Sequence, residues 1–246
     1  MRADGSAAKP VLLLAGTAEA RAVCEVAARE GLRVLASFAG RTRAPSLPVP
    51  TRVGGFGGDA GLRSVLNGVG AVLDATHPFA ATMSERAARL SAEAETPYLR
   101  LSRPPWPPEP HWRRHPDLED AARALPPGAR VFLATGCGGL AAFENRDLVL
   151  HCRRVDPAPP RPGIRWIVGP PGDAESEAAL FRRLAITHLV LKNAGGAARG
   201  KLVAARALGL AVHVVDRPPS PGGEEIHDID RALRFLRRHA APHRDA

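Results

Sequence analysis

Short apolar runs alternate with amphipathic stretches along almost the whole chain. In the first half, buried strands are predicted at residues 11–15, 33–38, 71–74 and 97–101. Helices are predicted at residues 18–30, 59–67 and 81–94. The first helix has apolar residues at helical spacing, namely Ala20, Val23, Cys24 and Ala27, and Gly31 marks its end. Asp59 is the expected N-cap of the second helix.

The second half repeats this alternation after a proline-rich stretch. Residues 102–110 contain five prolines in nine positions, which neither a helix nor a strand can accommodate, so a domain boundary is expected there. Strands are predicted at residues 130–134, 148–155, 166–168, 188–191 and 211–215. Helices are predicted at residues 174–184, 199–208 and 228–239.

Regular alternation of strands and helices is typical of parallel sheets covered by helices on both faces. We therefore expect an α/β protein with two Rossmann-like domains, residues 1–104 and 105–246, and an active-site cleft between them. In such sheets, ligands bind at the carboxyl ends of the strands. The loops that follow each strand are thus the places to look for function.

Composition narrows the class of protein. The 246 residues are 45% hydrophobic and 24% charged, as in ordinary globular proteins, and the net charge of +9 favours anionic partners. An aromatic content of 4% leaves few platforms for base stacking, so nucleic acid is not an expected partner. No apolar run approaches the roughly 20 residues that span a bilayer. The polar residues 1–10 do not resemble a signal peptide, which favours a cytoplasmic protein. The cysteines Cys24, Cys137 and Cys152 are expected to be buried thiols in a reducing compartment.

The turn after the first predicted strand suits a phosphate. Gly16 and Thr17 separate that strand from the helix opening at Ala18. A helix N-terminus presents unpaired N–H groups and partial positive charge, which together attract an anion. The G-x-G-x-x-G fingerprint of dinucleotide-binding folds is absent, so this turn alone does not identify a cofactor.

The end of the second predicted strand favours NADP over NAD. An acidic residue there would bond the 2′-hydroxyl of NAD in a dinucleotide fold. The sequence instead has Ser37, Arg41 and Arg43, and no carboxylate. Cationic side chains at this place are suited to the additional 2′-phosphate of NADPH.

Three further loops carry polar or glycine-rich motifs. Asp74-Ala-Thr-His-Pro-Phe-Ala80 follows a strand, and it is either part of a site or a solvated turn capped by Thr76. Thr135-Gly-Cys-Gly-Gly139 is either a nest of N–H groups for a carboxylate or phosphate, or a turn that needs glycine for its backbone. Lys192 and Lys201 bracket a glycine turn, where they could bind a carboxylate or supply a proton.

Several common sites are disfavoured. Gly195 to Lys201 nearly matches a P-loop, but Leu202 stands where Ser or Thr would hold magnesium. His111 and His115 lie between prolines with no evident third ligand, so no metal site is expected. Tyr98 lacks a lysine four residues later, and there is no G-x-S-x-G motif of hydrolases.

Taken in order, several of these motifs resemble the precorrin-6A reductase family, which acts in cobalamin biosynthesis. The specific ones are Asp74-Ala-Thr-His-Pro-Phe-Ala80 and Arg103-Pro-Pro-Trp106; the others are Ala15-Gly-Thr-Ala-Glu-Ala-Arg21, Ser37-Phe-Ala-Gly-Arg41, Thr135-Gly136 and Lys192-Asn-Ala-Gly-Gly196 with Lys201. The similarity runs from about residue 11 to residue 235. It departs from the family pattern at Ala15, where glycine is common, and at Cys137.

The resemblance implies NADPH-dependent reduction of one double bond of precorrin-6A, a polycarboxylate tetrapyrrole, to give precorrin-6B. It places NADPH on the first domain and the macrocycle in the cleft. The implied cofactor-binding residues are Gly16, Thr17, Glu19, Ser37, Ala39, Gly40, Arg41, Arg43, Gly55, Phe56, Gly57, Ala75, Thr76, His77 and Pro78. The implied substrate-binding residues are Arg103, Trp106, Thr135, Gly136, Cys137, Asn193, Gly195 and Gly196. The candidates for proton supply are Lys201, Lys192 and His77, with His77 near the nicotinamide.

Two other functions stay open at this point. One is an NADP-dependent reductase or epimerase for another small molecule such as a sugar nucleotide. The other is a non-catalytic module that binds polyanions, for which the excess positive charge is the support. The sequence leaves open whether the tetrapyrrole carries cobalt, which nicotinamide face reacts, and the oligomeric state, with which a monomer is compatible.

Overall fold

The computed structural model describes residues 9–40, 46–196 and 199–240, apart from the side chain of Cys137. The chain forms two compact units. Unit 1 comprises Met1–Arg103 and Pro219–Ala246, and unit 2 comprises Pro104–Pro218. Each is an α/β unit built on a parallel sheet, as the alternating pattern predicts.

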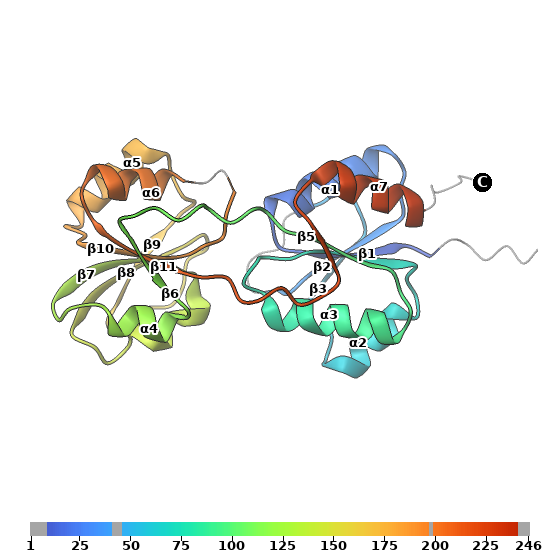
Figure 1. Cartoon of the computed structure of the whole chain (residues 1–246), viewed down its shortest axis with the longest axis horizontal. Coiled ribbons are helices and arrows are strands. Elements are labelled where there is room, and N and C mark those ends of the chain that lie inside the picture. The colour runs from blue at the N-terminus through green and yellow to red at the C-terminus, as the bar shows by residue number, and fades with distance from the viewer. Residues whose placement is uncertain (1–8, 41–45, 197–198, 241–246) are drawn as a thin grey trace, which may run out of the picture. The chain divides into compact units, whose positions relative to one another are not determined.

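Unit 1 contains six strands and four helices within its described residues (Figure 1). The strands are β1 (Val11–Ala15), β2 (Val34–Phe38), β3 (Thr51–Val53), β4 (Ala71–Ala75), β5 (Tyr98–Leu101) and β12 (Glu224–Ile226). The helices are α1 (Ala18–Arg29), α2 (Asp59–Leu66), α3 (Ala81–Glu93) and α7 (Ile229–His239).

The sheet of unit 1 has the order β12-β5-β4-β1-β2-β3, with every neighbouring pair parallel. Helices α1 and α7 lie side by side on one face, and α2 and α3 lie on the other (Figure 1). All five residues of β1 are buried, because this central strand is covered on both faces.

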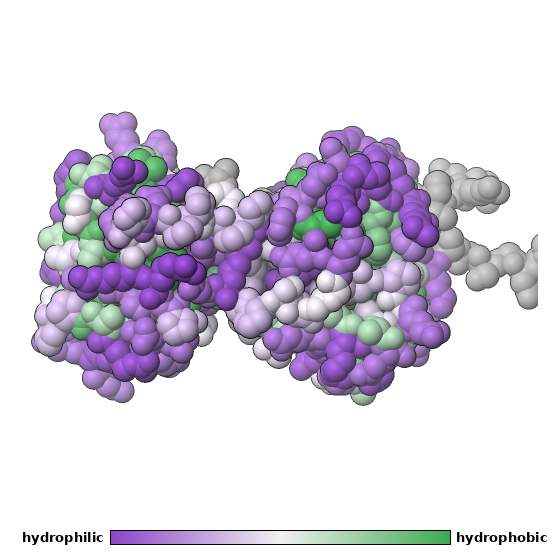
Figure 2. All heavy atoms as spheres, viewed as in Figure 1, coloured by the Kyte–Doolittle hydropathy of each residue, from purple (hydrophilic) through white to green (hydrophobic). Residues whose placement is uncertain are grey.

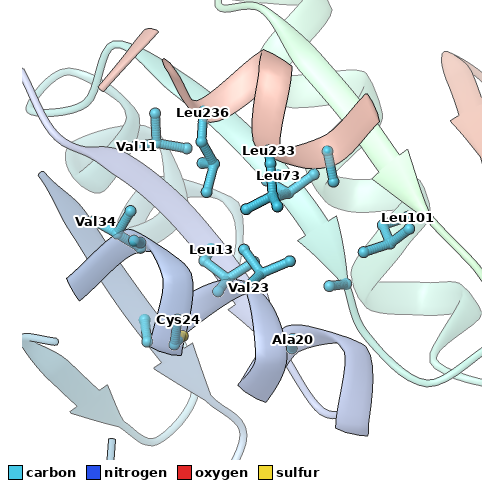
Figure 3. Packing of buried hydrophobic residues seen from close by; sticks show 14 of the residues in the cluster. Val11, Leu13, Ala20, Val23, Cys24, Val34, Leu73, Leu101, Leu233 and Leu236 are labelled. Carbon is cyan, nitrogen blue, oxygen red and sulfur yellow. The ribbon is translucent and has the colours of Figure 1, made fainter. Parts of the chain in front are cut away.

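Two apolar layers hold this sheet between its helices. On one face, Val23 of α1 and Leu236 of α7 pack with Leu13 and Leu73 of the central strands (Figure 3). On the other face, Leu12 and other buried residues of the sheet pack against α2 and α3. The apolar stripe of α1 predicted at Ala20, Val23, Cys24 and Ala27 is the face that is buried.

Unit 2 also contains a six-stranded sheet. Its strands are β6 (Trp112–His115), β7 (Ala129–Ala134), β8 (Leu148–Arg154), β9 (Ile164–Val168), β10 (His188–Lys192) and β11 (Ala211–Val215). Its helices are α4 (Leu118–Arg123), α5 (Ala174–Arg183) and α6 (Gly200–Ala207), with the 3-10 segment η1 (Cys137–Phe143) after β7.

The strand order of unit 2 is β6-β11-β10-β7-β8-β9, again parallel throughout. Helices α5 and α6 lie on one face and α4 on the other (Figure 1). The core on the α5 and α6 face includes Phe132, Phe181 and Leu189, all almost fully buried.

The two sheets have the same strand order, but the outermost strand next to β5 or β11 has an unusual origin in each. In unit 1 this place is taken by β12, which returns from the far end of the chain and pairs with β5 through Glu224, Glu225 and Ile226. In unit 2 it is taken by β6, which precedes the rest of its unit.

The expected domain of residues 105–246 is therefore wrong at its C-terminal end, because residues after Pro218 return to unit 1. Leu233 and Leu236 of α7 are buried in the core of that unit, and β12 extends its sheet. An amphipathic helix and a three-residue strand suit any open sheet face and edge, so their sequence does not indicate which sheet they join.

Other differences concern short elements and caps. Strands β3, β6 and β12 and helix α4 were not predicted, because none exceeds six residues. Gly58, not Asp59, is the N-cap of α2, and Asp59 pairs with Arg86 instead. Ala80 rather than Thr76 is the N-cap of α3.

The surface agrees with the composition. Hydrophilic residues cover most of the visible face of each unit, with scattered hydrophobic residues between them (Figure 2). Among the described residues, no helix is both long and apolar enough to cross a membrane. Cys24 and Cys152 are buried, as expected. Burial, with a smaller contribution from Glu25, raises the pKa of the Cys24 thiol to about 11, so it is unreactive.

Candidate functional site

Each sheet reverses its strand order at one point. In unit 1 the reversal lies between β1 and β4, and in unit 2 between β7 and β10. Ligands of open parallel sheets bind outside the carboxyl ends of the strands at such a point, since the loops there diverge to opposite faces. The motifs at Gly16–Thr17 and Ala75–Pro78 in unit 1, and at Thr135–Gly136 and Lys192–Gly196 in unit 2, all follow these strands.

The β1 turn of unit 1 is fixed by the Thr17 hydroxyl. Thr17 is the N-cap of α1, and its Oγ1 accepts a hydrogen bond from the Ala20 amide at 3.2 Å. The same hydroxyl donates to the carbonyl oxygen of Ala75 at 2.9 Å, which joins the β1 and β4 loops. A Cβ on Gly16 would stand 3.4 Å from the backbone nitrogen of His77, so the β1 and β4 loops lie close together here.

The buried carboxylate of Asp74 orders the loop that follows β4. Asp74 has no exposed surface, and its Oδ1 accepts the Thr76 amide at 3.0 Å. Its Oδ2 accepts the Tyr98 hydroxyl at 2.9 Å. Burial, followed by the charge of Asp74, raises the pKa of Tyr98, so the phenol stays protonated and donates. Sequence reasoning did not assign a site role to either residue, although Asp74 lies in the motif it singled out.

The ring of His77 is oriented by its own turn. Its Nδ1 accepts the Phe79 amide at 3.2 Å, so in this arrangement the neutral ring carries its proton on Nε2. Thr76 shares a hydrogen bond of 3.1 Å with the hydroxyl of Ser84 in α3, and Pro78 is buried. The implied nicotinamide residues therefore form an ordered turn next to Gly16.

The loops after β2 and β3 meet at the same edge. The Gly54 amide donates to the Phe38 carbonyl at 2.9 Å, and a Cβ on Gly40 would stand 3.4 Å from Val53. Ser37 is almost fully buried and accepts a hydrogen bond from Arg52. Arg52 was missed because β3 has three residues and follows a proline-rich loop.

Two expected residues of unit 1 pair with each other. Arg103, which follows β5, lies 3.6 Å from Glu19 of the first turn of α1, measured from Nε to Oε2. Arg41 and Arg43, the expected partners of a 2′-phosphate, lie outside the described residues.

The β7 loop of unit 2 is more exposed than the β1 loop. Gly136 is exposed and has φ 74°, a backbone conformation that favours glycine. It is the N-cap of η1 and makes no side-chain cap bond, and the Thr135 hydroxyl reaches only the Gly136 carbonyl, at 3.3 Å. A Cβ on Gly139 would stand 2.0 Å from a methyl carbon of Leu118, so Gly139 packs closely against α4.

Trp106 and the β10 loop clamp each other. The side-chain amide of Asn193 accepts the Trp106 backbone N–H at 2.8 Å and donates to its carbonyl at 3.1 Å. The Trp106 indole donates to the Gly196 carbonyl at 2.8 Å. A Cβ on Gly195 would stand 2.0 Å from the Pro104 carbonyl oxygen. These expected substrate-binding residues therefore lie together, and their described bonds give the loop a fixed shape.

The lysines of unit 2 stand at the same sheet edge. Lys192 ends β10, and Lys201 lies in the first turn of α6, partly buried. Burial lowers the pKa of Lys201; the charge of Glu177 opposes this and that of Arg153 adds to it. Glu177, 1% exposed, is ion-paired with Arg153 and accepts the Gly172 amide at 2.7 Å.

The histidines near the proline-rich stretch form a different arrangement from a metal site. His115 Nε2 and His213 Nδ1 lie 3.0 Å apart, and His115 Nδ1 lies 2.8 Å from Asp120. Within the described ranges, no three His, Cys, Asp or Glu side chains are placed to hold a metal ion.

Comparison with known proteins gives a consistent result. The sequence model of the family described as precorrin-6x reductase CbiJ/CobK matches residues 10–237, which include both units. A protein named precorrin-6A reductase from Rhodobacter capsulatus is 41% identical over 243 residues, covering 94% of this chain and 97% of its own. One of the same name from Mycobacterium tuberculosis (strain CDC 1551 / Oshkosh) is 44% identical over 237 residues, covering 92% and 96%.

A solved structure has the same fold. The structure titled "CobK precorrin-6A reductase" superposes with a TM-score of 0.87 at 40% sequence identity. The match covers 97% of this chain and 100% of that one. The similarity therefore includes the described folds of unit 1 and unit 2.

Proposed function

Because this chain belongs to the precorrin-6x reductase family, we propose that it reduces precorrin-6A to precorrin-6B with NADPH, in cobalamin biosynthesis. The family match over residues 10–237 is the observation that carries the proposal, since it includes the site motifs of both units. The reaction is an oxidoreduction of a ring double bond, which gains one hydride and one proton.

The loops at the carboxyl ends of β1 and β4 in unit 1 fit a nicotinamide dinucleotide. The capped N-terminus of α1 offers N–H groups to a pyrophosphate, and Gly16 leaves space where a side chain would stand. Thr76, His77 and Pro78 are ordered beside that turn and would hold the nicotinamide end. When bound there, NADPH supplies the hydride, and the protein supplies orientation.

The residues at the carboxyl end of β2 favour NADPH over NADH. Ser37 occupies the end of β2, where NAD-binding sheets present a carboxylate, and it bonds to a cation. Arg41 and Arg43 follow in the sequence, and we propose that they contribute to binding the 2′-phosphate. Ala39, Gly40, Gly55, Phe56 and Gly57 would line the adenosine end of the cofactor.

The loops at the carboxyl ends of β7 and β10 in unit 2 fit the carboxylates of a tetrapyrrole. Lys192 and Lys201 flank the β10 loop, and the exposed backbone at Gly136 can donate to an anion. Thr135, Cys137, Trp106, Asn193, Gly195 and Gly196 complete the proposed substrate contacts of unit 2. Arg103 is the proposed substrate contact of unit 1. A net charge of +9 favours a substrate with many carboxylates.

Lys201 is the proposed proton donor. Partial burial lowers its pKa, which brings an ammonium closer to the range in which it transfers protons efficiently. Lys192 is proposed to bind a carboxylate, and His77 to orient the nicotinamide through the ring fixed by Phe79. The cytoplasm is the proposed setting, since the buried thiol of Cys24 suits a reducing compartment.

The proposal is tested by mixing the purified chain with precorrin-6A and NADPH and following nicotinamide absorbance together with the mass of the tetrapyrrole. We expect NADPH consumption that requires the tetrapyrrole, and a product heavier by two hydrogen atoms. NADPH consumption without tetrapyrrole reduction, or none at all, would contradict it. Replacing NADPH with NADH is the internal control and is expected to slow the reaction.

A further inference from the structure

The structure assigns a role to Arg52 of β3: we infer that its guanidinium binds the 2′-phosphate of NADPH and is a main determinant of the preference over NADH. This inference rests on the proposed function, because it concerns the cofactor of that reaction. It deepens that proposal by naming a described residue, on a strand that the sequence pattern did not reveal.

Arg52 lies at the required place in the sheet. Strands β2 and β3 are parallel, and Arg52 is the register partner of Ser37 at the carboxyl end of β2. Partners in adjacent strands project to the same face, so the arginine and serine side chains lie next to each other. In a dinucleotide-binding sheet, the strand end occupied by Ser37 meets the adenosine ribose, and the 2′ position is therefore within the surroundings of Arg52.

The guanidinium is held rigidly. Its Nη1 donates to the Ser37 hydroxyl at 2.8 Å and to the Gly54 carbonyl at 3.3 Å. Its Nη2 donates to the Gly55 carbonyl at 3.0 Å. The plane lies over the ring of Phe56, with Cζ 4.1 Å from the ring centroid. A cation fixed in this way loses little conformational entropy when it binds an anion.

Its remaining donors suit a phosphate. Nη1 and Nη2 of Arg52 donate to Ser37, Gly54 and Gly55. The Nε–H has no hydrogen-bond partner within the described part of the chain, and it shares one edge of the guanidinium with an N–H of Nη2. Two parallel N–H groups on one edge match two phosphate oxygens, which is the bidentate geometry in which arginine binds phosphate.

The charge of Arg52 is also not neutralised nearby. The described side chains place no carboxylate within 4.0 Å of its guanidinium, whereas Arg63 of α2 and Arg89 of α3 are ion-paired. All three groups that accept its hydrogen bonds are neutral, namely one hydroxyl and two carbonyls. A partly buried cation with neutral partners gains more from a dianionic phosphate than from the ribose hydroxyl of NADH. That difference is the source of specificity.

The glycine turn provides the space for this contact. Gly54 has φ 113°, and Gly57 and Gly58 also have positive φ, so the chain folds back after β3 in a conformation that glycine favours. The fold brings the carbonyls of Gly54 and Gly55 to the guanidinium. The turn therefore orients Arg52, and Phe56 covers one of its faces.

The test measures the dissociation constants of NADPH and NADH by nicotinamide fluorescence for the wild-type chain and three variants. R52Q removes both the positive charge and the paired guanidinium N–H donors. R52K keeps the charge but lacks the paired donors. R33Q is the matched control, because Arg33 precedes β2 at the opposite edge of the same sheet. Thermal unfolding of each variant checks that it is folded.

We expect R52Q to weaken NADPH binding by about 10- to 100-fold, the loss typical of a charge-assisted pair, with NADH binding changed by less than about threefold. R52K is expected to lie between wild type and R52Q, and R33Q to resemble wild type. Equal losses for both cofactors would show that Arg52 only supports the turn, and no loss would assign the phosphate to other residues; either result overturns the inference. A wild-type chain that binds neither cofactor would instead refute the proposed function.

Discussion

The two sheets share one strand order but present differently built edges. In unit 1, the turn after β1 leads directly into a capped helix, and the hydroxyl of Thr17 ties it to the β4 loop. In unit 2, β7 leads into the 3-10 segment η1, whose N-cap Gly136 makes no side-chain bond. The comparison indicates that equal topology does not give equal chemistry. Unit 1 offers backbone N–H groups in a rigid turn, suited to a pyrophosphate, and unit 2 offers lysines.

The buried carboxylates differ in the same sense. Asp74 of unit 1 receives neutral donors, the Thr76 amide and the Tyr98 hydroxyl, and it thereby shapes a loop. Glu177 of unit 2 is paired with Arg153 and contributes to the electrostatic surroundings of Lys201. Asp74 therefore orders a loop and a phenol, whereas Glu177 accepts the Gly172 amide and also affects the pKa of Lys201. Substitutions in the two units should separate cofactor binding from proton transfer.

The largest expected effect is that of Lys201→Ala in unit 2. Loss of the proposed proton donor should lower kcat by about 100-fold and leave the NADPH dissociation constant unchanged. The wild-type rate should fall at a lower alkaline pH than an ordinary lysine would give, because the pKa of Lys201 is lowered, and this limb should vanish in the variant. Lys192→Ala, the control, should raise KM for the tetrapyrrole instead. An unchanged kcat in Lys201→Ala would exclude the assigned role.

Asp74→Ala should be the most destabilising change in unit 1. It would leave the Tyr98 hydroxyl and the Thr76 amide without partners in the core, at a cost of about 3 kcal/mol in the free energy of unfolding. NADPH binding should weaken as well, because the β4 loop loses its support. Glu177→Ala is the matched change in unit 2. Urea unfolding should show that it lowers the free energy of unfolding, and NADPH titration should show an unchanged affinity. If both variants lost NADPH equally, the division of roles between the units would not hold.

Lowering the pH should reduce the folding stability of unit 2 before that of unit 1. Burial, with the charges of His115, His188 and Arg113, lowers the pKa of His213 to about 4. The unfolded chain takes up a proton below about pH 6.5, while the folded chain does not, so stability present above that pH is lost as the pH falls toward 4. From pH 7 to pH 5 the loss from this group is about 2 kcal/mol.

Hydrogen exchange in β11 of unit 2 and β1 of unit 1 at the two pH values measures this effect. His213→Gln should reduce the pH dependence in β11 and leave β1 unaffected. Equal pH dependence in the variant and the wild type would contradict the assignment to His213.

The smallest expected effect compares two threonines at corresponding turns. Thr17→Val should cost about 1 kcal/mol in stability, because it removes the cap of α1 and the bond to Ala75. NADPH binding should weaken a few-fold. Thr135→Val should cost less than about 0.5 kcal/mol, since its hydroxyl caps no helix. Thermal unfolding of both variants would show whether the hydroxyl orders only the unit 1 turn.

Sequence pattern revealed most of the fold, because long periodic segments carry their own signal. The buried run at β1 and the apolar stripe of α1 are examples. It did not reveal that α7 belongs to unit 1, since an amphipathic helix pairs equally well with either sheet. Strand β3 was missed because three residues after a proline-rich loop do not establish a period.

The site was predictable where it follows a strand and not where it depends on tertiary contacts. Gly16, Thr17 and the Asp74-to-Ala80 motif stand directly after predicted strands, and the structure brings them together. The roles of Tyr98 and Arg52 depend on partners 24 and 15 residues away, which no local pattern shows. Trp106 and Asn193, expected to bind substrate, were also found to bond to each other across the chain.

The most direct test of the account is amide hydrogen exchange, measured by mass spectrometry with and without NADPH. The claim under test is that the cofactor binds at the carboxyl ends of β1 and β4 in unit 1. We expect NADPH to protect residues 16–20, 54–58 and 75–80 most strongly, with less change in the β7 loop and at residues 199–205 of unit 2. Protection confined to those unit 2 segments, with exchange at residues 16–20 unaltered, would contradict it.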